Sequence, residues 1–115
     1  MEEIEIWHNP RCGKSRETLA LIENAGHTPK IRLYLKDNPT FSEISATLKK
    51  LDALPLALIR TNEPVFIESY KGKALSDNEY IQAMVDNPIL IERPVVIKNN
   101  HAILGRPPGN VLKLI

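Results

Sequence analysis

The sequence predicts an α/β fold: a four-stranded mixed sheet with a helical insertion between a β-α-β half and a β-β-α half. Three observations carry this prediction. Short apolar runs near both ends of the chain have strand patterns, a helical pattern separates the first two strands, and two helix start signals lie in the middle of the chain. Because 115 residues suit one core, we expect a single domain over residues 1–115.

The first half has the pattern of a strand, a helix and a second strand. Residues 3–7 alternate in polarity, which is typical of a strand. Residues 15–24 place apolar side chains at helical spacing before Gly26, a residue type that commonly ends helices. Residues 30–35 alternate again and predict the second strand. A crossover of this kind makes the two strands parallel.

The middle of the chain is predicted to be helical. Two capping boxes, in which Ser or Thr precedes Glu by three residues, begin at Thr40 and Ser76. They predict one helix over residues 40–51 and another that ends before Pro88. Residues 61–75 carry mixed signals, and we expect them to be irregular.

The last third predicts a hairpin followed by a helix. The apolar run 94–97 is typical of a strand covered on both faces. Residues 99–100, both Asn, predict a turn that leads into a partner strand over 102–104. Pro107 and Pro108 then begin a final helix, where proline is tolerated in the first turn. The outer halves match those of a thioredoxin-like fold, and we expect helices on both faces of its sheet.

Composition excludes several classes of partner. Fifteen basic residues nearly balance fourteen acidic ones, so the charge predicts no binding to nucleic acid or to an anionic membrane. The first residues lack the pattern of a secretory signal, and no apolar run is long enough to span a bilayer. The single cysteine favours a reducing compartment. We therefore expect a cytoplasmic protein, and a monomer.

Cys12 carries the strongest chemical signal in the sequence. It lies in a polar turn, directly before the first predicted helix, whose N-terminal N–H groups favour an anion. Arg11, Lys14 and Arg16 add positive charge beside it, and these conditions lower the pKa of a thiol. The alternative is a buried, inert cysteine. Because the polar turn would hold Cys12 near the surface, we predict a reactive thiolate.

For two neighbours of Cys12, Ser15 and His8, the sequence leaves alternative roles open. Ser15 stands where a dithiol site would have its second cysteine, so it cannot resolve a mixed disulfide, and electrons must come from outside the chain. Its side chain would donate to the thiolate or cap the helix. His8 would be a general base, a charge neighbour of Cys12, or only a strand-end residue. No metal-ligand spacing links the three histidines, so we predict no metal.

Three arginines lie where the chain leaves predicted core segments, which is where site residues tend to lie. They are Arg60, Arg93 and Arg106. The planar guanidinium suits tetrahedral oxyanions, although most arginines are solvated surface charges. The bond before Pro94 is a candidate for the cis form, and in a thioredoxin-like fold this proline would carry Arg93 to Cys12.

Residues 8–16 fit the pattern His-Asn-Pro-x-Cys-x-x-Ser-Arg, which resembles the signature of the glutaredoxin-linked arsenate reductases. Residues 84–95 and 104–107 are similar to the second and third signature blocks of that family. The resemblance runs almost end to end. Longer members extend past the last helix, and this chain is more similar to the short branch.

The resemblance implies a role for each candidate residue. Cys12 would be the nucleophile that forms a covalent thioarsenate. Arg60, Arg93 and Arg106 would bind the arsenate oxygens, and His8 would help to lower the pKa of the thiol. The resemblance implies no tightly bound cofactor. Glutathione and glutaredoxin would supply the electrons, and arsenite would be released.

Two other functions stay open on the sequence. A reactive monothiol does not specify arsenate, so the chain could be a general glutathione-dependent thiol reductase. It could also be a non-catalytic transcription regulator of the same fold that binds RNA polymerase. Those regulators usually carry a second cysteine at the place of Ser15, which weighs against that alternative.

Overall fold

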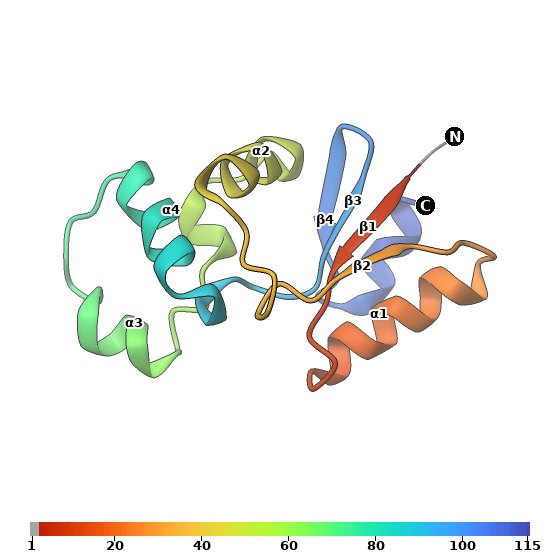
Figure 1. Cartoon of the computed structure of the whole chain (residues 1–115), viewed down its shortest axis with the longest axis horizontal. Helices are drawn as coiled ribbons and strands as arrows, with labels where there is room; N and C mark the ends of the chain where they lie inside the picture. Colours follow the sequence, from red (N-terminus) through yellow and green to blue (C-terminus); the bar gives the residue numbers. More distant parts are fainter. Residues whose placement is uncertain (1–2) are drawn as a thin grey trace. The chain divides into compact units, whose positions relative to one another are not determined.

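The computed structural model describes residues 3–115, which form two compact units (Figure 1). One unit contains residues 3–37 and 93–115, and the other spans Asn38–Glu92. The first unit holds the sheet and Cys12. The second coincides with the predicted helical insertion between the two halves.

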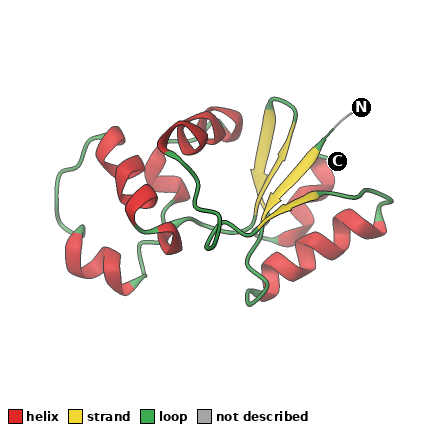
Figure 2. Ribbon diagram, viewed as in Figure 1, coloured by secondary structure: helices red, strands yellow, loops and turns green. Residues whose placement is uncertain are grey.

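The sheet unit contains four strands in the order β2-β1-β3-β4 (Figure 2). The central strand β1 pairs in parallel with β2 and antiparallel with β3, and β4 pairs antiparallel with β3. This mixed sheet confirms the predicted fold class. The strands are β1 (Ile4–Trp7), β2 (Lys30–Arg32), β3 (Val95–Lys98) and β4 (His101–Leu104).

Two helices, α1 (Gly13–Asn24) and η3 (Pro108–Lys113), pack against one face of this sheet. Ile6 and Val96 lie opposite each other on that face, and both are fully buried. Ile22 of α1 and Val111 of η3 complete the same apolar cluster. Burying a side chain of this size contributes roughly 1.5–3 kcal/mol. The cluster therefore fixes α1 beneath the strand that leads into Cys12, while helices over the other face stay a prediction.

The second unit is helical and has its own core. Its longest helices, α2 and α4, pack together, and η1 and η2 both pack against α4. Segments 58–60 and 90–92 lie side by side, joined by a short antiparallel bridge between Ile59 and Ile91. The helices are α2 (Phe41–Leu51), η1 (Pro55–Leu58), α3 (Pro64–Ser69), α4 (Asp77–Asp86) and η2 (Pro88–Leu90).

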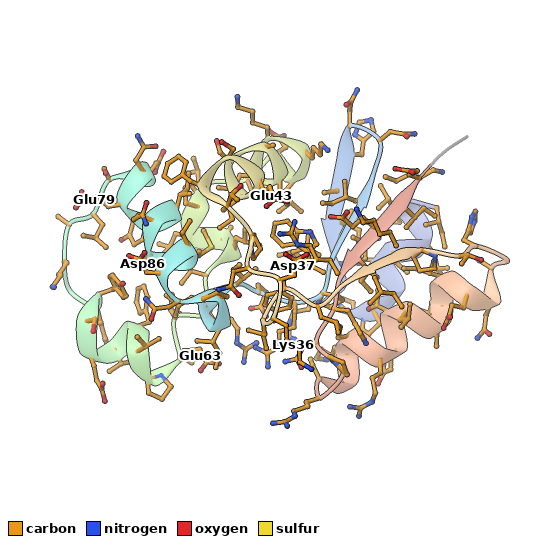
Figure 3. The ribbon with its side chains drawn as sticks, viewed as in Figure 1. Lys36, Asp37, Glu43, Glu63, Glu79 and Asp86 are labelled. Atoms are coloured by element: carbon orange, nitrogen blue, oxygen red, sulfur yellow. The ribbon has the colours of Figure 1, made fainter. Side chains whose placement is uncertain are left out.

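Both predicted capping boxes are formed, at the starts of α2 and α4. Their glutamates, Glu43 and Glu79, are labelled in Figure 3. The Thr40 hydroxyl accepts from the Glu43 N–H at 3.2 Å, and the Glu43 carboxylate accepts from the Thr40 N–H at 2.9 Å. Ser76 and Glu79 make the same pair of bonds at 3.2 and 3.0 Å. Each box satisfies N–H groups that the first turn of a helix leaves without partners.

The prediction for residues 61–75 was wrong in part, because helix α3 lies within this segment. Pro64 occupies the first helical turn, where its missing N–H costs nothing, and Phe66 is buried. The helix has only 6 residues, too few for a helical period to be recognised in the sequence.

Two other elements differ from their predicted form. Strand β2 ends at Arg32, because the Lys36 and Asp37 N–H groups both donate to the Leu33 carbonyl at 2.9 Å and turn the chain. Tyr34 is buried as a result. The final helix is present but is a 3₁₀ helix over its whole length. Within residues 3–115, none of the helices is long and apolar enough to cross a membrane.

Candidate functional site

A tight turn at the end of β1 sets the position of Cys12. The Cys12 N–H donates to the Asn9 carbonyl at 3.0 Å, and the Asn9 side chain accepts from the Arg11 N–H at 3.1 Å. Arg16, one turn into α1, donates to the Pro10 carbonyl at 2.9 Å. Turn and helix are thus tied together, and Cys12 becomes the N-cap residue of α1, half-buried, with an extended backbone.

The sulfur of Cys12 lies among hydrogen-bond donors. Burial by itself raises the pKa of the thiol, but the Ser15 N–H, the Arg93 side chain and the Lys14 N–H all stabilise the thiolate. The net result is a pKa below the ordinary value for cysteine. The helix N-terminus and one arginine therefore favour the ionised, nucleophilic form at this position.

Arg93 and Arg106 come from the two ends of the β3-β4 hairpin. Both Arg93–Pro94 and Arg106–Pro107 peptide bonds are cis. The Gly105 N–H donates to the Pro94 carbonyl at 2.9 Å, and an Arg106 Nη1–H donates to the Arg93 carbonyl at 3.3 Å. Arg93 reaches Cys12 with its side chain, whereas Arg106 contacts the Arg93 backbone.

Ser15 uses its hydroxyl in neither of the two predicted ways. The side chain is fully buried, and its oxygen accepts from the Asn9 N–H at 3.1 Å and lies 2.6 Å from His8 Nδ1. The N-cap residue is Cys12, and Ser15 contributes its backbone N–H to the sulfur. The hydroxyl therefore fastens the turn to the end of β1.

His8 is buried and the pKa of its imidazole is lowered, mainly by that burial and also by the positive charge of Arg16. The neutral ring can accept at Nδ1. The Ser15 hydroxyl donates to Nδ1 when the ring carries its proton on Nε2, and it accepts from Nδ1–H in the other tautomer. His8 is not among the groups that stabilise the Cys12 thiolate, so its predicted help with the thiol pKa stays a prediction.

Arg60 belongs to the second unit, where it follows the buried residues Leu58 and Ile59. Its Nε–H donates to Glu63 at 3.0 Å and an Nη1–H donates to Glu92 at 2.9 Å. These two carboxylates raise the pKa of the guanidinium, more than offsetting the effect of burial. Arg60 is thus held by two acidic partners, and its convergence with Cys12 stays a prediction.

Metal binding would need several ligands side by side. Across residues 3–115, no three His, Cys, Asp or Glu side chains are grouped so as to hold a metal ion.

The ArsC family model matches residues 7–114, which is nearly the whole chain. The chain belongs to the ArsC family. Among ArsC relatives, it is 40% identical over 114 residues to an arsenate reductase of Haemophilus influenzae, covering 97% of this chain and 98% of the relative. It is 37% identical over 120 residues to an arsenate reductase of Escherichia coli, covering 100% of this chain and 82% of the relative.

The solved structures agree with this ArsC assignment. An arsenate reductase structure from Vibrio cholerae superposes with a TM-score of 0.95 at 41% identity, covering 98% of both chains. The thioredoxin-like fold predicted from the element order is confirmed by this similarity.

Three residues of this ArsC chain were given no role by the sequence analysis, although Glu92 and Gly105 lie within the second and third signature blocks. Glu63 and Glu92 hold Arg60, and Glu92 lies far from Arg60 along the chain. Gly105 lies against α1: an added Cβ would be 2.5 Å from Thr18 Oγ1 and 2.7 Å from Pro94 Cγ.

Replacing Ser15 by alanine is expected to destabilise the fold by about 1–3 kcal/mol, because the buried Nδ1 of His8 and the Asn9 N–H both lose their partner. The pKa of Cys12 should change little, because the Ser15 N–H remains. Urea unfolding measures the first effect and the pH dependence of alkylation the second. Ser42→Ala, an exposed serine of α2, is the matched control. Equal stability of the two variants would contradict this role for the hydroxyl.

Proposed function

We propose that this ArsC chain reduces arsenate to arsenite in the cytoplasm, with Cys12 as the nucleophile. One observation carries the proposal: the Cys12 sulfur lies at the N-terminus of α1, where the backbone N–H groups of Lys14 and Ser15 and the Arg93 side chain stabilise the thiolate. Such a position favours a thiolate, and the same donors suit the oxygens of a tetrahedral anion. The arsenate reductases among the relatives indicate which anion to test.

The first chemical step forms a bond between Cys12 Sγ and arsenic. The thiolate attacks As(V), and one arsenate oxygen leaves as water after it is protonated. The product is a covalent thioarsenate. Arsenic is still As(V) in this thioarsenate, so a reduction step must follow.

That reduction needs an external thiol, because the chain has one cysteine. An incoming thiolate attacks Cys12 Sγ and forms a mixed disulfide with it. The electron pair of the S–As bond stays on arsenic, which is released as arsenite. A second thiol then regenerates the Cys12 thiolate and completes an external disulfide. We propose glutathione and glutaredoxin as these donors, with no tightly bound cofactor.

Arg93, Arg106 and Arg60 are proposed to bind the arsenate oxygens. Arg93 is supported by its contact with the Cys12 sulfur and Arg106 by its bond to the Arg93 carbonyl. Preorganised donors of this kind stabilise the charge that grows on the oxygens as sulfur attacks. Pro94 lies between Arg93 and the start of β3, and we propose that it supports this loop, because its carbonyl accepts from the Gly105 N–H at 2.9 Å.

Arsenate-dependent oxidation of NADPH, coupled through glutathione, glutaredoxin and glutathione reductase, tests the proposal. We expect activity that Cys12→Ser removes entirely, because the variant has no sulfur to attack arsenic. Leaving out glutaredoxin should slow the reaction. A wild-type rate equal to that of Cys12→Ser would refute the proposal.

The same assay with a glutathione mixed disulfide in place of arsenate tests the alternative of a general thiol reductase. A much higher rate on the disulfide than on arsenate would favour that alternative. The proposal expects the opposite order.

A further inference from the structure

We propose that Glu63 and Glu92 are positioning residues that hold the Arg60 guanidinium ready for an oxyanion. The inference rests on the proposed function, in which Arg60 binds arsenate. It adds that the two acidic residues beside an anion-binding arginine improve anion binding, although their charge taken alone opposes it.

Each carboxylate takes a different edge of the guanidinium. Glu63 accepts from Nε–H at 3.0 Å and Glu92 accepts from Nη1–H at 2.9 Å. All three side chains are about four-fifths shielded from solvent, with exposed fractions of 18–22%. Two charge-assisted bonds to separate nitrogens fix both the position and the plane of the group.

The backbone makes this arrangement rigid. The Arg60 N–H donates to the Leu90 carbonyl and the Glu92 N–H donates to the Leu58 carbonyl, both at 2.7 Å. These bonds place Arg60 and Glu92 on adjacent strand-like segments. The backbone of Glu63 is tied to Arg60 as well, because the Glu63 N–H donates to the Arg60 carbonyl at 3.2 Å.

The bonds to the carboxylates leave part of the guanidinium available. Nη2 makes no hydrogen bond to any of residues 3–115, whereas the carboxylates take Nε–H and Nη1–H. A guanidinium fixed in this way can offer Nη2 to an oxygen without first losing side-chain freedom. The Glu63 carboxylate makes no N-cap bond to α3, so capping of the helix does not explain its position. Glu63 is labelled in Figure 3.

The test compares Glu63→Ala, Glu92→Ala and the double variant, with Glu68→Ala as the matched control. Glu68 is an exposed glutamate of α3 in the same unit, so its loss removes one negative charge without removing a bond to Arg60. Binding is measured without turnover, as protection of Cys12 from iodoacetamide by increasing arsenate. KM and kcat come from the coupled assay.

We expect the double variant to bind arsenate about three- to tenfold more weakly, since ordering a freed long side chain costs affinity on that scale. KM for arsenate should rise as binding weakens, and kcat should change less than KM. Glu68→Ala should match the wild type. In an Arg60→Ala background the glutamate substitutions should have no further effect, because they act through Arg60.

Unchanged or tighter arsenate protection in the double variant would overturn the inference, and tighter binding would show that the carboxylates only repel the anion. If the alanine variants unfold, Glu63→Gln and Glu92→Gln keep an acceptor and replace them, with a smaller loss expected in the same direction. Protection without turnover would refute the proposed function but leave the inference standing. No protection of the wild type would overturn both.

Discussion

Replacing Arg93 by alanine is expected to lower kcat/KM for arsenate by about 100-fold or more, the usual effect of removing a preorganised oxyanion donor. The variant loses the side chain that contacts the Cys12 sulfur, together with its positive charge. The pKa of the thiol should therefore rise toward its ordinary value, and less thiolate should be present at neutral pH. Kinetics and alkylation across pH measure the two effects separately.

Arg93→Lys separates the charge of Arg93 from its shape. A lysine keeps a positive charge near the sulfur but lacks the planar fork. We expect its thiol pKa to lie between those of the wild type and the alanine variant, while kcat/KM stays well below wild type. Equal kcat/KM values for Arg93→Ala and the wild type would remove Arg93 from the proposed mechanism.

Replacing Gly105 by alanine is expected to destabilise the fold by about 2–3 kcal/mol, near the upper end for overpacking. The new Cβ would lie 2.5 Å from Thr18 Oγ1 and 2.7 Å from Pro94 Cγ. Thr18 is fully buried and its hydroxyl donates to the Lys14 carbonyl at 2.8 Å, so it has little freedom to move. The contact links α1 to the loop that carries Arg93.

Gly109→Ala is the matched control for Gly105→Ala. Nothing lies within 4 Å of a Cβ built at Gly109, so the free energy of unfolding of this variant should lie within about 1 kcal/mol of the wild-type value. Urea unfolding of both variants gives the comparison. If Gly105→Ala were as stable as Gly109→Ala, the packing of the loop against α1 would be looser than described.

Local patterns were enough to predict most of the elements. Alternation identified the strand around Ile6, and a continuous apolar run identified the strand around Val96. Reciprocal Ser/Thr and Glu spacing identified the starts of α2 and α4, because a capping box lies within four consecutive residues. Helix α3 was missed because fewer than two turns show no recognisable helical period. The end of β2 depends on a turn at residues 33–37 that side-chain alternation does not reveal.

The candidate site was predictable where its chemistry is local. Cys12 and the N–H groups of α1 lie within four residues of one another, so the chain order alone brings them together. The Ser15 hydroxyl was misjudged because its partner, His8, lies on the other side of the turn. The bond between Arg60 and Glu92 depends on the pairing of segments 58–60 and 90–92, which no local pattern predicts.

The central claim is that folding holds the Cys12 thiol ionised. The rate of iodoacetamide alkylation of the native protein, followed across pH, measures this directly, because Cys12 is the one cysteine in the sequence. The account predicts a midpoint clearly below the value of about 8.5 for free cysteine. A midpoint at or above that value would contradict it.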